Sequence, residues 1–316
     1  MGQVEVRPDA GVLALLRGEG AGPAVAVRFA QCPNPEVADR LAASGAGWLT
    51  AGEWGRVEHP HSGFVRKTET CDGRRALRTT LYAPEGKLHE LRDAESGEVL
   101  ESFVRRVNDF KALRSHLKDL CQLPAARMPN LCAVGAPPLR EMQARWAAPA
   151  ILKTSQEAGD ENWASCLRKL ERLFRHRCEQ AARAGATALL LGDGLPQGAA
   201  EDWLAALDTQ LDWLNRHVGM PLYVAMKQWD DGLALGLAQR NVGVHLSATA
   251  LTALADMGGW EGRLILELAL DDLGDLEGSV KLLRQCPRAL LLVAGEPVQQ
   301  EEMEWLARLS GNTQGD

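Results

Sequence analysis

The stretch from residue 163 to residue 195 constrains the fold most, because a long amphipathic helix, a glycine, an apolar strand and an acidic loop follow one another directly. Apolar residues recur at helical spacing on one face, and basic residues fall on the other side. The apolar positions are Trp163, Leu167, Leu170, Phe174, Cys178 and Ala181, and the basic ones are Arg168, Lys169, Arg172 and Arg175. A basic run of this kind is most often the solvated side of a helix.

The end of this stretch places an acidic residue after a buried strand. Gly185 stands where a left-handed helix stop is expected, since glycine has no Cβ to oppose that conformation. Residues 186–191 are apolar except for Thr187, which is typical of a parallel strand buried on both faces. Asp193 then lies at the carboxyl end of that strand, where α/β proteins place their chemistry.

The same helix–strand pattern recurs along the chain and predicts a (β/α)8 barrel of the TIM type rather than an open sheet. Eight strands are expected, at 24–29, 47–50, 131–135, 186–191, 222–226, 242–246, 264–268 and 289–293. Helices are expected between most of them, at 35–44, 138–146, 199–217, 232–239, 248–257, 273–284 and 299–309. Asn34 before Pro35 has the pattern of a helix N-cap. We expect residues 1–316 to form a single barrel domain.

The segment 56–120 breaks this pattern. Strand-like runs at 77–82, 87–91 and 99–106 are separated by turns at 83–86 and 95–97, and a helix is expected at 109–120. This is a small antiparallel meander, which we interpret as an inserted flap over the barrel mouth.

Composition excludes several classes of protein. The net charge of −7 over 316 residues disfavours non-specific binding to nucleic acid, which needs a basic surface. No signal peptide is visible, and no apolar run is long enough to span a membrane. The seven cysteines are scattered and form no Cys-x-x-Cys pair, which indicates reduced thiols and a cytoplasmic protein.

Several segments resemble one known family. Five segments have a counterpart in that family. They are the run Leu-Leu-Arg-Gly-Glu at 15–19, the hairpin at 83–88, the helix start at 107–113, the strand and loop at 184–194, and the final loop with Gly295, Glu301 and Glu302. Together they resemble the uroporphyrinogen decarboxylase superfamily, which includes corrinoid-dependent methyltransferases. The resemblance covers most of the chain and implies a barrel enzyme that forms homodimers.

The chain departs from that family at the residues that carry its chemistry. The methyltransferase branch binds zinc through a His-x-Cys pair and a late Cys, a soft ligand set that activates a thiol. Aligned on Pro221, those positions hold Ala225, Lys227 and Glu296. No zinc or other cofactor is therefore predicted. The arginine-rich segment that the decarboxylase uses for substrate carboxylates is reduced here to Arg28 and its neighbours.

Three residues are predicted to be catalytic, and each has a structural alternative. Asp193 is either a general acid/base or amine-binding group or the cap of the next helix. Lys227 is either a lysine with a tuned pKa, beside Glu296 in the vacated metal position, or half of a structural ion pair. His245 is either an acid/base group or a hydrogen-bonded core histidine.

Four acidic or basic residues near strand ends are predicted to contact substrate: Arg28, Glu53, Glu267 and Glu296. The alternative for Arg28 and Glu53 is a solvated charge in a loop. His59 and His61 have the spacing of a metal-binding pair, but the sequence offers no clear third ligand, so a loop is the simpler interpretation.

Two hypotheses about function follow. The first is an enzyme that decarboxylates, or transfers a methyl group from or to, a tetrapyrrole, corrinoid-linked or other small carboxylated or methylated substrate at the barrel mouth. The second is a catalytically changed member that binds a small ligand or a partner such as a corrinoid protein. The lost zinc ligands favour the second hypothesis, and the charged residues at strand ends favour the first.

Overall fold

A computed structural model describes residues 8–20, 23–135, 161–192, 200–226, 229–247, 260–269, 285–295 and 300–313. The chain divides into two compact units. The first, here called the barrel unit, comprises Met1–Trp54, Ala125–Ala136 and Cys178–Asp316. The second, here called the flap unit, comprises Gly55–Pro124 and Pro137–Arg177.

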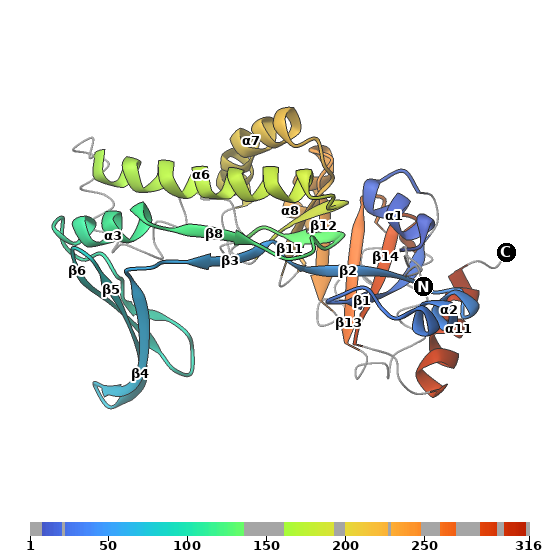
Figure 1. Ribbon diagram of the computed structural model, residues 1–316, viewed down its shortest axis with the longest axis horizontal. Coiled ribbons are helices and arrows are strands. Elements are labelled where there is room, and N and C mark those ends of the chain that lie inside the picture. The colour runs from blue at the N-terminus through green and yellow to red at the C-terminus, as the bar shows by residue number, and fades with distance from the viewer. Residues whose placement is uncertain are drawn as a thin grey trace, which may run out of the picture. The chain divides into compact units, whose positions relative to one another are not determined.

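The barrel unit contains a closed eight-stranded barrel, which confirms the predicted (β/α)8 fold (Figure 1). Its strands are β1 (Ala24–Phe29), β2 (Gly47–Glu53), β9 (Leu131–Ala133), β10 (Ala188–Leu191), β11 (Leu222–Met226), β12 (Gly243–Ser247), β13 (Leu264–Ala269) and β14 (Ala289–Ala294). Every neighbouring pair is parallel, and the order around the barrel follows the order along the chain. All eight sequence-predicted strands are therefore present.

Helix α1 (Ala10–Arg17) packs against the inner core of the barrel. Its Val12 and Leu16 belong to the same buried cluster as side chains from β1, β2, β9, β10, β11, β13 and β14. A Cβ on Gly47, the first residue of β2, would lie 2.5 Å from Val12, so only glycine allows this approach. Because Gly47 begins its strand, α1 lies at the amino-terminal end of the barrel. The carboxyl end is left for a binding site.

Besides α1, the described helices of the barrel unit lie close to their predicted ranges. They are α2 (Pro35–Ala43), the last turns of α6 (Glu161–Arg183), α7 (Ala200–His217), α8 (Asp231–Gln239) and α11 (Gln300–Thr313). The Asn34 side chain accepts a hydrogen bond from the Val37 amide at 2.9 Å, which confirms the predicted N-cap. Gly185 has φ of 87°, as predicted for a helix stop. The predicted helices at 138–146, 248–257 and 273–284 lie outside the described residues.

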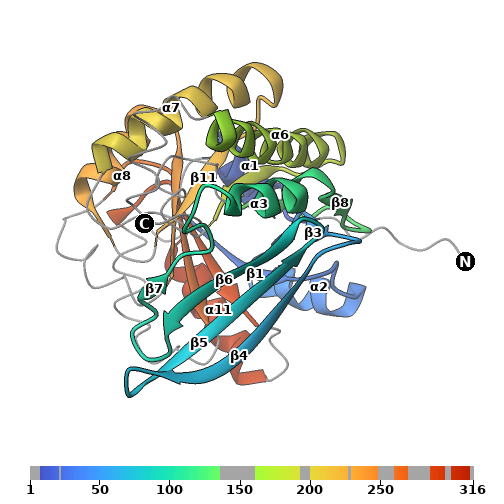
Figure 2. The same cartoon turned by 90° about the vertical axis from the view of Figure 1, so that its left-hand side faces the viewer.

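The flap unit is built on a four-stranded antiparallel sheet covered on one face by helices (Figure 2). The sheet has the order β4 (Gly63–Cys71), β5 (Arg74–Ala83), β6 (Gly86–Asp93) and β7 (Val99–Glu101). Helix α3 (Asp109–Lys118) and the first part of α6 pack their apolar faces on it, through residues such as Phe110, Leu113 and Cys166. A separate two-stranded ribbon joins β3 (Gly55–Glu58) to β8 (Cys121–Pro124).

The predicted strand at 99–106 was too long, since β7 ends at Glu101. Phe103 and Val104 are both buried although they are adjacent, which a strand with alternating faces does not allow. Beyond them, the Asp109 carboxylate accepts hydrogen bonds from the amides of Arg105 and Arg106, both at 2.9 Å. Hydrogen bonds to the Asp109 side chain thus stand where backbone pairing would have extended β7.

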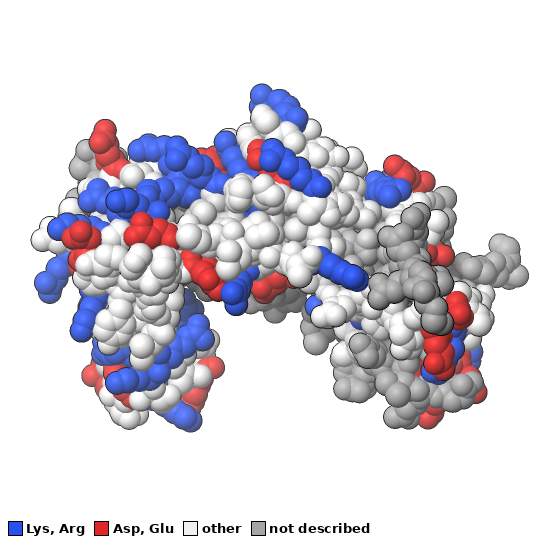
Figure 3. All heavy atoms as spheres, in the orientation of Figure 1, with Lys and Arg blue, Asp and Glu red and all other residues white. Residues whose placement is uncertain are grey.

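The basic side of α6 is exposed, as its sequence pattern predicted. Arg168 and Arg172 are exposed, and in Figure 3 Lys and Arg side chains gather along this helix. Arg175 pairs with Glu171 one turn away at 2.5 Å. No helix within the described ranges has the length and hydropathy to cross a membrane.

Candidate active site at the carboxyl end of the barrel

Three ionisable side chains from three different strands form a connected group, here called the mouth triad: Arg28 of β1, His245 of β12 and Glu267 of β13. The Glu267 carboxylate accepts a hydrogen bond from Arg28 Nη1 through its Oε1 atom. Its Oε2 atom lies 2.8 Å from His245 Nε2. These residues are 239 and 22 positions apart in the chain, so closure of the barrel brings them together.

The strand geometry explains why all three side chains face the barrel interior. Successive side chains of a strand point to opposite faces, so residues two apart share a face. Arg28 follows Ala26 by two, and Glu267 follows Ile265 by two, and both Ala26 and Ile265 belong to the interior cluster. His245 follows Gly243 by two, and a Cβ on Gly243 would meet the interior ring of Tyr223. The mouth triad therefore lies on the carboxyl side of the apolar core.

The electrostatics of the triad favour an ionised Glu267. Burial raises the pKa of this carboxyl, but the hydrogen bond and charge of His245 and the charge and hydrogen bond of Arg28 outweigh burial, and the pKa falls below its ordinary value. Only 18% of the Glu267 side chain and 13% of the His245 side chain are exposed, whereas Arg28 is 39% exposed. Arg28 is thus the member of the triad most open to a ligand.

This arrangement suits proton transfer. A carboxylate bonded to one nitrogen of a histidine fixes the ring orientation and stabilises its protonated form. Nε2 of His245 is occupied by Glu267, and its Nδ1 has no hydrogen bond to another described residue. The imidazole can therefore accept or donate a proton at Nδ1. The remaining N–H groups of Arg28 can hold an anion.

Of the three residues aligned above with the zinc ligands of the methyltransferase branch, the structure describes only Ala225. Ala225 of β11 lies beside His245 in the sheet register, and its methyl side chain has no donor atom for a metal. Within the described ranges, no three His, Cys, Asp or Glu side chains are grouped as a metal site would require. The other two positions, Lys227 and Glu296, lie outside the described residues, as does Asp193.

Glu53, the last of the predicted substrate contacts, takes no part in the mouth triad. It ends β2 beside Ala133 of β9, is exposed, and makes no ion pair with any residue that the structure describes. Its contact with a substrate stays a prediction, beside the alternative of a solvated charge at the strand end.

At the opposite end of the barrel, the structure shows a buried polar group that the sequence did not indicate. The Tyr223 hydroxyl donates to the carbonyl oxygen of Leu16 at 3.1 Å and lies 3.4 Å from that of Leu15, at the end of α1. The guanidinium of Arg263, only 7% exposed, lies over the Tyr223 ring and donates to the Asn241 carbonyl. A cation near the carboxyl end of a helix is electrostatically favourable, so Arg263 and Tyr223 together stabilise the position of α1.

In the flap unit, a third histidine lies near His59 and His61, for which the sequence favoured a loop over a metal site. The ring of buried His116 stacks on that of His59, with centroids 4.7 Å apart and planes 17° apart. Nitrogen lone pairs lie in the ring planes, so stacked rings do not direct their lone pairs at one ion. His59 Nδ1 also accepts a hydrogen bond from the His61 amide at 3.0 Å. The cluster is therefore a packing contact in this conformation.

Comparisons with known proteins do not show a family for this chain. No protein family model matches the chain, and no curated protein matches it. The chain is similar to one solved structure, a methyltransferase from Methanosarcina mazei, with 11% sequence identity and a TM-score of 0.49, over 95% of this chain and 97% of that one. A likeness at this level carries no inference about activity.

Proposed function

We propose that the chain is an enzyme, related to the uroporphyrinogen decarboxylase superfamily, that acts on a small carboxylated molecule at the carboxyl end of the barrel. The observation that carries this proposal is the mouth triad: a histidine oriented by a carboxylate and an adjacent, partly exposed arginine. In this proposal His245 transfers a proton, Glu267 orients it, and Arg28 holds a substrate carboxylate.

Between the two reactions considered, the triad favours decarboxylation over methyl transfer. Decarboxylation breaks the bond between the substrate carbon and its carboxylate, carbon dioxide leaves, and the electron pair stays on the carbon. That carbon then needs a proton, which protonated His245 can give from Nδ1 before it is reprotonated by water. The thiol activation that zinc supplies in the methyltransferase branch has no counterpart at Ala225.

One observation supports the second candidate function, a non-catalytic ligand-binding protein. Arg28 is already paired with Glu267, so a substrate carboxylate has to compete with a carboxylate of the protein. A ligand with a cationic or amide group, or a partner such as a corrinoid protein, would not meet this competition.

The test measures binding and turnover separately. A panel of tetrapyrrole and aliphatic polycarboxylates is titrated by calorimetry, and release of carbon dioxide is followed with each compound that binds. We expect His245→Gln to abolish turnover and keep binding, and Arg28→Met to weaken binding at least tenfold. Glu53→Gln is the matched control at a strand end outside the triad. Binding without turnover in the unmodified protein would establish the second function, and carboxylate binding unaffected by Arg28→Met would refute the first.

A further inference from the structure

The outer edge of β4 in the flap unit is long and exposed, and Arg66, Lys67 and Glu69 are the charged residues along it. β4 is the first strand in the order β4-β5-β6-β7, and no other described strand pairs with its free edge (Figure 2). Seven of its nine residues are exposed, and the other two are half-buried. Phe64 and Val65 are 50% and 41% exposed. A long edge with unpaired backbone groups and exposed apolar side chains is a template for pairing with another strand.

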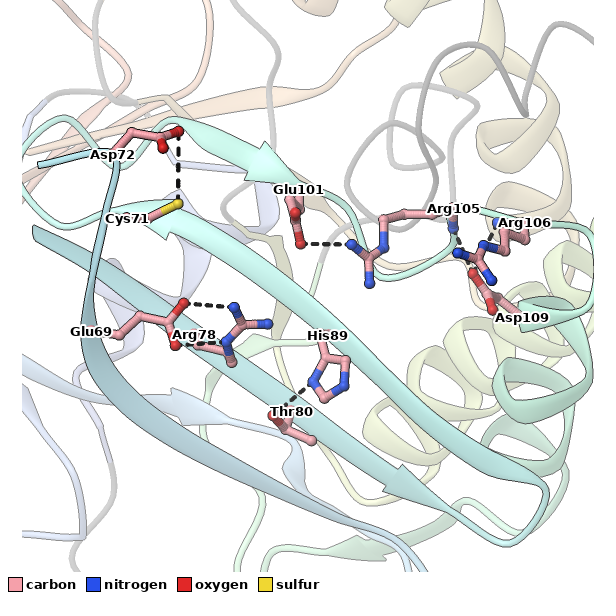
Figure 4. Close-up of polar contacts among 10 residues, drawn as sticks. All are labelled: Glu69, Cys71, Asp72, Arg78, Thr80, His89, Glu101, Arg105, Arg106 and Asp109. Carbon is pink, nitrogen blue, oxygen red and sulfur yellow. Dashed lines mark hydrogen bonds and ion pairs between the residues drawn. The ribbon is translucent and has the colours of Figure 1, made fainter. Parts of the chain in front are cut away.

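The charges on β4 indicate which strand fits there. Lys67 lies directly opposite Arg78 on β5, and it forms no ion pair with any described residue. Arg78 instead binds both oxygens of Glu69, at 2.6 and 2.7 Å, on the sheet face shown in Figure 4. Lys67 thus faces a like charge and lacks an anion, while the Glu69 carboxylate, one-third exposed, can accept a further hydrogen bond.

We propose that β4 pairs antiparallel with β4 of a second copy of this chain, about a two-fold axis at Thr68. In this register Lys67 of each copy lies opposite Glu69 of the other, and Val65 lies opposite Cys71. Each cross-strand pair then joins two odd-numbered or two even-numbered residues. Side chains on one face of the first sheet therefore stay on the same face of the second. The two four-stranded sheets become one sheet of eight strands, an isologous contact of the kind that closes a dimer.

Neighbouring registers are disfavoured by like charges. An axis at Lys67 places that lysine opposite its own copy, and an axis at Arg66 or Glu69 does the same for those residues. Among these four registers, the axis at Thr68 is the one in which no charged residue of β4 meets a like charge; Lys67 meets Glu69, and Arg66 meets Thr70. Charge complementarity therefore selects both the partner, a second copy, and the alignment.

Sedimentation of the full chain over a wide concentration range tests this proposal. We expect a dimer that weakens as salt is added, because the charge pairs lie at an exposed edge. Lys67→Glu should weaken dimerisation at least tenfold, and the double swap Lys67→Glu with Glu69→Lys should restore it. Lys87→Glu, the same charge change on β6 away from the edge, should leave it unchanged.

A cross-linking experiment tests the register itself. Val65→Cys places a thiol opposite Cys71 of the partner subunit, and mild oxidation with oxidised glutathione should give a reducible dimer that is lost when Cys71→Ser is added. A monomeric but folded unmodified chain would overturn the proposal. A dimer that Lys67→Glu leaves intact, or one that Val65→Cys does not cross-link, would overturn it as well.

Discussion

His116 predicts how acid destabilises the flap unit. This side chain is 5% exposed, and Nδ1 has no hydrogen-bond partner among the described residues. Burial, followed by the charge of nearby His59, lowers the pKa of His116 from 6.5 to about 4. Below pH 6.5 the unfolded chain therefore takes up a proton that the folded chain takes up only near pH 4. The free energy of unfolding should fall across this window, and this contribution should be absent above it.

The magnitude follows from the two pKa values. Each pKa unit corresponds to about 1.4 kcal/mol, so the full difference is worth about 3 kcal/mol of unfolding free energy at pH 4. Acidic groups also lose stabilising contacts in this range, so the measurement must be a difference between variants. His116→Phe keeps a ring against His59 and Phe64 but cannot take up a proton.

Urea unfolding of the full chain at several values between pH 7 and pH 4, followed by circular dichroism, provides the assay. The unmodified chain should lose about 3 kcal/mol more than His116→Phe over this window. His176→Phe, at an exposed histidine of α6, is the control and should follow the unmodified chain. Parallel pH profiles for the chain and His116→Phe would refute the reasoning.

Three further predictions concern the barrel unit. Tyr223→Phe should lower the free energy of unfolding by about 1–2 kcal/mol in urea, because the end of α1 loses a buried hydrogen bond. Gly243→Ala should lower the free energy of unfolding by about 1–3 kcal/mol, since the new Cβ would lie 2.4 Å from the Tyr223 ring. Adding Tyr223→Leu should recover part of that loss in the same assay. Glu267 has a lowered folded pKa, so its contribution to stability is present above its unfolded pKa and is lost as pH falls through the folded value. In Glu267→Gln, the free energy of unfolding should therefore fall less steeply as the pH is lowered. An unchanged slope would contradict the ion pairs at the barrel mouth.

The sequence by itself determined the barrel. Parallel strands buried on both faces are continuous apolar runs, and helices between them have a periodic apolar face, so both patterns are local and readable. The capped helix start at Asn34 and the stop at Gly185 are equally local, because each depends on one residue and its nearest backbone. The sequence did not indicate β4, whose residues are exposed on both faces and so lack the alternation that marks a half-buried strand.

Only the tertiary structure decided which charged residues meet. Arg28, His245 and Glu267 were each candidates from their places near strand ends, but nothing local distinguishes them from Glu53, which stays apart. Their contact depends on the register of β1, β12 and β13 and on closure of the barrel, which set side chains from distant segments on one interior layer. The same holds for Tyr223 and Arg263, since a buried hydroxyl and a buried cation are recognisable only once α1 is seen to end beside them.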